Sequence, residues 1–438
     1  MKSDQLPDTS VSMDTAVPTD MQHEGECVGR PISFRLRLRR WLWHVFARQF
    51  MLPPMVALAV ARLIGRRRRL VSKGCKILLT GRFDSRNWIL NHLGPLSASK
   101  NCSRVWMVST NPVPALPKVE AIYPPKWLVR VVGATPARLL IFLCVAIQKR
   151  PHIVGGFHIV VNGIAAVTVA RLIGAQSMYF CVGGPAEIRD GGIHSADSLF
   201  TKMETADPVV ERRLLRAVGA ADTIVTMGTK AVDFFREKGI IADFHVVSGG
   251  IDPLRFKPAE EAACYDLILT GRLVAVKRID IFLQTIQNIV DRIPDVRAAI
   301  VGDGRLRDEL HSLSVKMDID RNVSFVGHQE NIEAWLRKSK IFVLTSDSEG
   351  LSLSVMEAMM CGLPAVVSDV GDMGDLVKDG VNGYLVPRRS PELFADRLIE
   401  LLSDDGKLRT FSLAARRTAM RYETLATIQR WDSILASL

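Results

Sequence analysis

Two glutamates, Glu349 and Glu357, are the residues of this chain whose type and spacing most clearly suggest chemistry. They stand in the stretch T-S-D-S-E-G-L-S-L-S-V-M-E-A-M-M-C-G-L-P-A-V-V-S-D, residues 345–369. A carboxylate accepts two hydrogen bonds from a pair of neighbouring hydroxyl groups, and a hexose and a ribose both offer such pairs. One loop could therefore place one carboxylate on each sugar of a nucleotide-sugar.

The local sequence predicts the elements that position these glutamates. The apolar run 341–344 predicts a strand, a helix follows from about Ser354 to Gly362, and residues 365–367 predict a second strand. Such a strand–loop–helix–strand unit builds parallel sheets, whose ligands bind beyond the carboxyl ends of the strands. We therefore expect both glutamates at a ligand-binding edge.

Each glutamate also has a purely structural alternative. Ser354 and Glu357 have the spacing of a capping box, in which the glutamate only satisfies the start of the helix. Glu349 precedes Gly350 and would in that case be a solvated turn residue.

A basic turn follows the predicted strand 267–270. Gly271 would let a ligand approach the backbone, and Arg272 and Lys277 supply full positive charges. The start of the helix that follows adds partial positive charge. Such a cradle suits a diphosphate, which gains negative charge as its bond to a sugar breaks. The alternative is a solvated basic turn.

Together these motifs resemble the donor site of family 4 glycosyltransferases, which have the GT-B fold. The family signature is a Glu, seven residues, a second Glu and A-M-x-x-G-x-P-x-V, with G-R-L-x-x-x-K earlier in the chain. The matching residues here are Gly271, Arg272, Leu273, Lys277, Glu349, Glu357, Ala358, Met359, Gly362, Pro364 and Val366. The resemblance covers roughly residues 75–438 and is strongest from Tyr265 onward.

The resemblance implies a fold, a reaction and roles for the site residues. The fold is α/β, with two Rossmann-like domains facing a cleft. The reaction is transfer of a sugar from a nucleoside-diphosphate sugar to an acceptor with retention of configuration. The family roles assign the transferred sugar to Glu349 and the ribose to Glu357, while Arg272 and Lys277 stabilise the departing diphosphate. Neither a metal nor another cofactor is expected.

Further binding residues follow from the same resemblance. Backbone amides of a loop and several turn residues would contact the substrates: Gly350, Leu351, Ser352 and Leu353 in the loop, and Gly81, Gly183, Gly184, Gly302, Gly327 and His328 at strand ends. The family often has Phe-Gly where this chain has Leu351 and Ser352, which predicts a sugar pocket of different shape. The G-x-G at Gly302 could alone signal a dinucleotide fold, but no third glycine is in register.

One histidine of the family has no counterpart in register, because its position falls at Gly183. His158 and His194 are candidates for its role, although a lone histidine is more often a structural hydrogen-bonding residue. Gly183 and Gly184 could instead offer backbone N–H groups to an acceptor phosphate.

The chain of 438 residues is long enough for several domains with their own cores. We expect a disordered start and an apolar, basic extension over residues 1–74, and an acceptor-side domain over 75–255. A donor-binding domain is expected over 256–415, and a final helix over 416–438 that crosses back to the first domain. Within the first domain, residues 128–148 predict an apolar helix, interrupted near Gly133 and Pro136, that belongs to the core.

The net charge of +11 predicts anionic partners, and much of it lies between residues 35 and 69. Apolar residues from Phe34 to Phe46 recur at helical spacing among arginines, which is typical of a helix on a membrane surface. Pro53 and Pro54 are expected to break it, the run 55–64 is too short to span a bilayer, and residues 66–69, all arginine, suit anionic headgroups.

Two alternatives remain for this segment: packing on the protein itself, and a true span. A span would bury His44, Arg48 and Gln49, which is costly. The seven cysteines are odd in number and form no C-x-x-C, and the first thirty residues lack a secretory signal. We therefore expect a cytoplasmic protein, peripheral on the inner face of a membrane.

The sequence thus predicts a glycosyltransferase of polysaccharide or glycolipid synthesis, acting on a glycan or lipid-linked acceptor. The alternatives are a nucleotide-sugar epimerase of the same fold and a non-catalytic membrane-associated scaffold. A nucleic-acid partner is not expected, because the basic residues lack interleaved aromatic residues outside the N-terminal helix.

Overall fold

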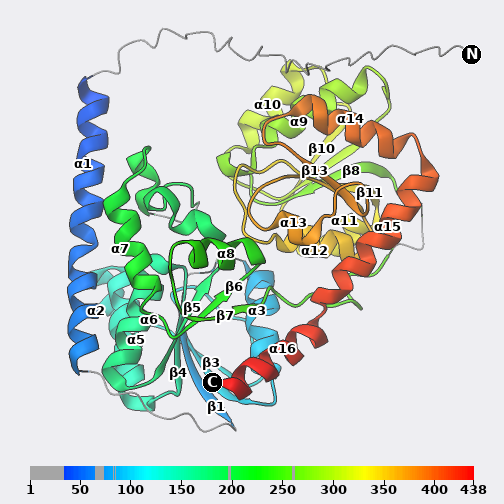
Figure 1. Ribbon diagram of the computed structural model, residues 1–438. Helices are drawn as coiled ribbons and strands as arrows, with labels where there is room; N and C mark the ends of the chain where they lie inside the picture. Colours follow the sequence, from blue (N-terminus) through cyan, green and yellow to red (C-terminus); the bar gives the residue numbers. More distant parts are fainter. Residues whose placement is uncertain (1–33, 65–73, 82, 84, 196–198, 259–261) are drawn as a thin grey trace, which may run out of the picture.

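The computed structural model describes residues 34–64, 74–81, 83, 85–195, 199–258 and 262–438. The predicted disorder of residues 1–30 and the arginines at 66–69 lie outside the described residues. The described chain forms two α/β bodies side by side, each a twisted sheet between helices (Figure 1). The predicted α/β fold with two Rossmann-like domains is confirmed.

The first sheet has seven parallel strands among the described residues, in the order β3-β2-β1-β4-β5-β6-β7. Its strands are β1 (Cys75–Thr80), β2 (Cys102–Val108), β3 (Val119–Ile122), β4 (Ile153–Phe157), β5 (Gln176–Cys181), β6 (Thr223–Thr226) and β7 (Asp243–Val246). Its helices are α3 (Arg86–Ala98), α4 (Lys126–Val132), α5 (Ala134–Lys149), α6 (Ile164–Ile173), α7 (Pro208–Val218) and α8 (Thr229–Glu237). The strands are apolar on both faces because helices cover both sides of a parallel sheet.

The second sheet has six parallel strands among the described residues, in the order β10-β9-β8-β11-β12-β13. They are β8 (Tyr265–Thr270), β9 (Ala298–Val301), β10 (Val323–Gly327), β11 (Ser339–Leu344), β12 (Ala365–Ser368) and β13 (Gly383–Val386). The helices are α9 (Ile279–Val290), α10 (Arg307–Lys316), α11 (Ile332–Arg337), α12 (Leu353–Met360), α13 (Met373–Leu376) and α14 (Pro391–Leu402). The chain order reverses beside β8, and such a switch point opens a ligand crevice at the strand ends.

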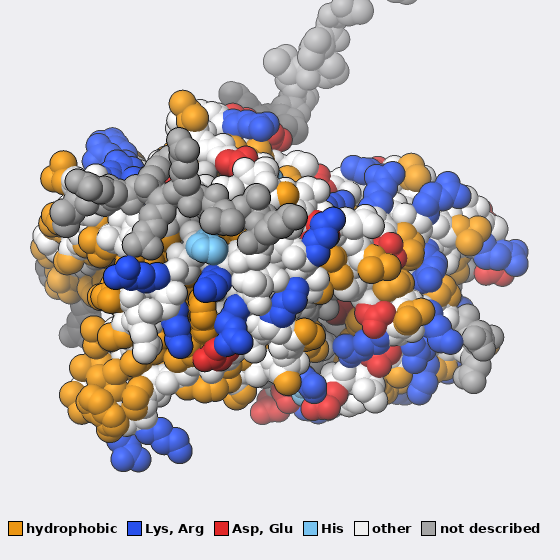
Figure 2. Space-filling view, turned by 90° about the horizontal axis from the view of Figure 1, so that it is seen from below, with side chains coloured by type: hydrophobic (Ala, Val, Ile, Leu, Met, Phe, Trp, Pro, Cys, Tyr) orange, Lys and Arg blue, Asp and Glu red, His pale blue; other side chains and the backbone are white. Residues whose placement is uncertain are grey.

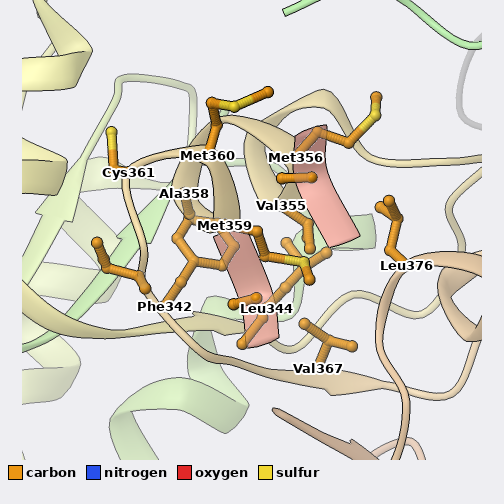
Figure 3. Close-up of a cluster of buried hydrophobic side chains, with 14 of the residues drawn as sticks. Phe342, Leu344, Val355, Met356, Ala358, Met359, Met360, Cys361, Val367 and Leu376 are labelled. Atoms are coloured by element: carbon orange, nitrogen blue, oxygen red, sulfur yellow. The ribbon is translucent and has the colours of Figure 1, made fainter. Parts of the chain in front are cut away.

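The helix that carries Glu357 is fixed by its packing. Figure 3 shows side chains of α12 gathered with Phe342 and Leu344 of β11 and with Val367 of β12. Residues 355–360 of this helix are all buried, so α12 is apolar nearly all round. Burial of each valine and methionine side chain of this helix contributes about 1.5–3 kcal/mol, which holds the loop before α12 in place.

The last helices connect the two bodies. Helix α15 (Asp405–Ala419) packs on α12, and α16 (Thr424–Ser437) packs on α3 of the first body (Figure 1). The Ile251 N–H donates to the Tyr422 carbonyl at 2.9 Å, and the Thr424 N–H donates to the Ile251 carbonyl at 3.0 Å. Trp431 is buried in the core beside the first sheet, so the chain end belongs to that core.

Helices α1 (Phe34–Phe50) and α2 (Leu52–Ile64) lie along the outside of the first body (Figure 1). The expected break at Pro53 and Pro54 needs correction, because the helices divide at Met51 and continue in nearly the same direction. Both prolines occupy the first turn of α2, where a helix needs no N–H donor. Within the described residues, Leu38–Leu63 is one helical segment with the length and composition to cross a bilayer.

The apolar segment 128–148 divides at Gly133, as predicted, into α4 and α5. The expectation that it belongs to the core holds only for α5, which buries Phe142, Val145 and Ala146. Helix α4 has no buried residue.

Candidate active site

A cavity of about 970 Å³ lies between the two bodies. The second body lines it with the turns that follow β8, β9, β10 and β11, and with the start of α12. The first body contributes the start of α3, His158 and the turn after β5. The volume is in the range of natural ligand sites, and the place is where parallel sheets bind ligands.

The four charged residues singled out in the sequence all line this cavity: Arg272, Lys277, Glu349 and Glu357. The Lys277 Nζ atom lies 2.7 Å from Glu349 Oε1, and both side chains are mostly buried. A lysine and a glutamate that pair in this cleft can each exchange this partner for a group of a ligand. The ammonium would take an anion and the carboxylate would take hydroxyl groups.

The pairing follows from how two strand ends are joined. The Asp347 N–H donates to the Val276 carbonyl at 2.8 Å, and the Thr345 hydroxyl donates to the Arg278 carbonyl at 2.9 Å. These bonds tie the loop after β11 to the turn after β8. They bring Lys277 and Glu349 together although the residues are far apart in sequence.

Two glycines allow the backbone to close around the cleft. A Cβ atom on Gly302 would lie 1.8 Å from the Gly271 carbonyl oxygen, so the ends of β8 and β9 can meet only without a side chain there. A Cβ atom on Gly350 would lie 2.2 Å from the Val182 carbonyl oxygen. Gly350 therefore lets the loop after β11 touch the turn after β5 of the first body.

Glu357 is a buried carboxylate rather than a capping residue. Helix α12 begins at Leu353, so Ser354 lies inside the helix and no side chain caps its start. Glu357 is 7% exposed, and burial raises its pKa to about 7, while Arg255 and Asn91 oppose this rise. A carboxylate held this way changes its charge easily when a ligand provides hydrogen bonds.

Most of the other predicted binding residues also line the cleft: Gly183, Gly271, Gly302, His328, Gly350, Leu351, Ser352 and Leu353. Gly81, Gly184 and Gly327 lie outside its lining. The Phe83 ring covers Gly81, where a Cβ atom would lie 2.4 Å from the ring. Gly327 faces the Arg307 guanidinium, and Gly184 lies near Asp372 and the loop after β11.

The two candidate histidines lie in different surroundings. His158 lines the cleft and its Nδ1 atom lies 2.9 Å from Glu187 Oε1. His194 is exposed, pairs with Asp190 at 3.0 Å and does not line the cleft. The fold thus brings His158, and not His194, to the side of the cleft where the family histidine is missing.

Sequence reasoning missed Glu187, which supports this part of the cleft from behind. The side chain is 3% exposed and accepts hydrogen bonds from the Gly183 N–H at 2.6 Å, the Ile159 N–H at 3.0 Å and the Tyr179 hydroxyl at 2.8 Å. Burial raises its pKa, but His158 and these donors lower it more, so the net shift is downward. Only its position after Gly183 and Gly184 could have indicated this role.

The buried carboxylate makes a stability prediction. Replacing Glu187 with glutamine puts an amide NH₂ group among neighbours that donate, so at least one buried donor loses its acceptor. We expect the melting temperature to fall by about 5 °C or more. Thermal denaturation followed by circular dichroism measures this loss.

The matched control is Glu120→Gln. Glu120 also accepts hydrogen bonds, from Arg104 and Trp106 at 3.0 Å each, but it is exposed. Equal melting temperatures for the Glu187 variant and the wild type would show that the buried network contributes little.

Solved structures of other proteins share this arrangement of two domains. The chain has a TM-score of 0.65 to HepE of Anabaena in complex with UDP and glucose, at 18% identity, covering 83% of this chain and 100% of that chain. For sucrose-phosphate synthase of Thermosynechococcus elongatus the TM-score is 0.68 at 16% identity, with 82% and 98% covered. This chain therefore has the GT-B fold.

Sequence comparison identifies the second domain more closely. Residues 264–404 match the family model of glycosyl transferases group 1. D-inositol 3-phosphate glycosyltransferase of Streptomyces bingchenggensis is 28% identical over 244 residues, which are 50% of this chain and 52% of the relative.

A second curated relative is similar over a shorter stretch. Poly(ribitol-phosphate) alpha-N-acetylglucosaminyltransferase of Staphylococcus aureus is 29% identical over 169 residues, 38% of this chain and 34% of the relative. The chain thus spans about half of the first relative and about a third of the second.

Proposed function

We propose that this protein is a glycosyltransferase that moves a sugar from a nucleoside-diphosphate sugar to a glycan or lipid-linked acceptor. The observation that carries the proposal is the cleft in which Arg272, Lys277, Glu349 and Glu357 meet. The charged and hydrogen-bonding groups of this cleft match the three parts of one donor molecule: its sugar, its diphosphate and its ribose. The neighbour HepE was solved with UDP and glucose, and TarM of S. aureus with UDP, which supports a donor of this kind.

The donor would exchange the Lys277–Glu349 pair for its own groups. The Lys277 ammonium turns to the diphosphate and joins Arg272, so that two cations meet the charge of the departing nucleotide. The freed Glu349 carboxylate accepts hydrogen bonds from hydroxyls of the transferred sugar. Glu357, more deeply buried in the cleft, accepts from the ribose hydroxyls.

The resemblance to family 4 supports transfer with retention of configuration. The bond from the anomeric carbon to the diphosphate oxygen breaks, and the acceptor oxygen forms its bond on the same face. The departing phosphate oxygen takes the acceptor proton, so no side chain has to act as general base. Lys277 and Arg272 would stabilise the negative charge on that oxygen.

The orientation of α1 supports a peripheral position on a membrane, which we place on the cytoplasmic face as expected from the sequence. Two side chains of its second half turn toward the protein: His44 Nδ1 lies 2.7 Å and Arg48 Nε 2.9 Å from the carboxylate of Asp207. Arg39 and Arg40 bind Glu204 in the same way.

The outward face of α1 and α2 is apolar. Exposed side chains along it are Leu38, Trp41, Leu42, Phe46, Leu52, Val56, Val60 and Leu63. A helix with its polar side on the protein and its apolar side outward suits the boundary of a bilayer. A true span would separate the buried Asp207 from His44 and Arg48, which is costly. We therefore propose a surface helix.

Nucleotide binding tests the proposed function directly. A donor at about 100 times its Kd stabilises a protein by about 2.7 kcal/mol, so we expect a rise in melting temperature of roughly 5–10 °C. A panel of UDP, GDP and ADP and their sugars, measured by thermal denaturation, would also identify the base.

The failures of this test are informative. No shift with any nucleotide or nucleotide-sugar would count against the donor site and favour a non-catalytic scaffold. Turnover of the nucleotide-sugar to its epimer without an acceptor would favour the epimerase.

A further inference from the structure

A second apolar surface lies on α4 and α5 of the first body. Trp127 is 65% exposed and Val131 75% exposed, and both lie one turn apart on α4. Leu140 and Ile147, 48% and 58% exposed, lie two turns apart on α5. Soluble proteins rarely expose so many large apolar side chains on neighbouring helices without a partner.

Helix α6 links this surface to α2. Helix α4 contacts α5, α5 contacts α6, and α6 packs on α2, so each helix contacts the next. Leu172 near the end of α6 is also exposed. Figure 2 shows hydrophobic side chains gathered along one edge of the molecule, at the lower left, with Lys and Arg side chains beside them.

The charge of these helices has one sign only. The chain has no Asp or Glu between Glu26 and Asp84, nor between Glu120 and Glu187. These two acid-free stretches contain α1 and α2, and α4, α5 and α6. On the second group Lys126, Arg130, Lys149 and Arg150 are exposed around the apolar residues.

We propose that α4 and α5 are a second membrane contact, which binds an anionic bilayer together with α2. Trp127 and Val131 enter the boundary between headgroups and acyl chains, where tryptophan is favoured, while Lys126 and Arg130 bind anionic headgroups. The proposal rests on the membrane association proposed above for α1 and α2.

Charge favours the bilayer over a second copy of the chain. A symmetric dimer through this face would place the same patch of both copies together, so that basic residues of one copy would face basic residues of the other. Like charges across an interface oppose association. An anionic lipid surface complements the same residues.

Two contacts on separate helices would fix how the protein sits on the membrane. A single helix on the surface leaves the rest of the protein free to rotate about it. A second contact on α4 and α5 removes this freedom and holds the first body, which contributes one wall of the cleft, at a constant angle to the bilayer.

Cosedimentation of the full chain with vesicles tests the proposal. We compare phosphatidylcholine alone with phosphatidylcholine mixed with phosphatidylglycerol. The variant Trp127→Ser/Val131→Ser and the variant Lys126→Gln/Arg130→Gln are each expected to lower partitioning into the anionic vesicles on the order of tenfold. Circular dichroism should show an unchanged fold, since all four side chains are exposed.

Two further variants make the outcomes distinct. Val315→Ser/Leu413→Ser removes equally exposed apolar side chains from the second body and is expected to leave partitioning unchanged. Trp41→Ser/Phe46→Ser removes the α1 contact. If only the α1 variant loses binding, the α4–α5 contact is refuted while the proposed membrane association stands.

Other results would also overturn the proposal. Wild-type protein that binds neither kind of vesicle refutes both the α4–α5 contact and the membrane association, whereas nucleotide binding would still test the donor site. Equal binding to neutral and anionic vesicles refutes the role of the basic residues. A dimer in analytical ultracentrifugation that the Trp127→Ser/Val131→Ser change dissolves would assign this face to a second copy instead.

Discussion

Replacing Lys277 with alanine is expected to lower turnover by about 100- to 1000-fold while the protein stays folded. The loss follows from the proposed role of the Lys277 ammonium, which meets the charge that develops on the departing diphosphate. Arg272 alone would then face this charge. Initial rates with saturating donor, and the melting temperature of the same preparation, measure both parts of the prediction.

Lys340→Ala is the matched control for this experiment. Lys340 also forms an ion pair, with Asp266 at 2.8 Å, but it lies at the opposite end of β11 from the cleft. We expect its turnover to equal that of the wild type. Full turnover in the Lys277 variant would contradict the proposed leaving-group stabilisation, since the variant would have lost the ammonium and kept the rate.

Replacing Glu357 with glutamine is expected to weaken donor binding by about 10- to 100-fold, because a hydrogen bond to a charged acceptor contributes about 1.5–3 kcal/mol. The same change should stabilise the empty protein at alkaline pH. A neutral amide of similar shape has no charge to bury, whereas the ionised carboxylate does. Calorimetric titration with a nucleotide-sugar and thermal denaturation without ligand measure the two effects.

The pH dependence gives this prediction a sign. The pKa of Glu357 is raised from 4.5 in the unfolded chain to about 7 in the folded protein. Its contribution to stability is therefore fully favourable below pH 4.5, declines as the pH rises and is lost above about 7. The glutamine variant should lack this decline, so its gain in melting temperature over the wild type should be larger at pH 8 than at pH 5.

Binding should change with pH in the opposite direction. The ribose hydroxyls need the ionised carboxylate, so donor affinity of the wild type should fall as the pH drops from 8 to 6, and that of the glutamine variant should not. Glu392→Gln, an exposed change on α14, is the control. A pH-independent affinity in the wild type would rule out Glu357 as the group that binds the ribose.

The sequence by itself determined the strand–loop–helix–strand unit that carries both glutamates. The glutamates, the glycine that ends α12 and the strands on either side all lie within residues 339–368. The secondary structure of such a unit can be predicted from its own sequence. The residue pattern of a strand, the start of a helix and a turn glycine are all local properties. The basic turn after β8 is equally local, and the family model covers this same region.

Only the tertiary structure decided how these pieces work together. The Lys277–Glu349 pair depends on hydrogen bonds between two loops that follow neighbouring strands, and Glu187 gains its role from donors on several elements. Local sequence patterns also could not predict that α4 is exposed or that Arg48 of α1 faces the protein. An apolar or basic residue has the same type whichever way its helix turns. Packing between segments that are distant in the sequence decides which face of a helix meets the core. Short-range sequence patterns cannot reveal this packing.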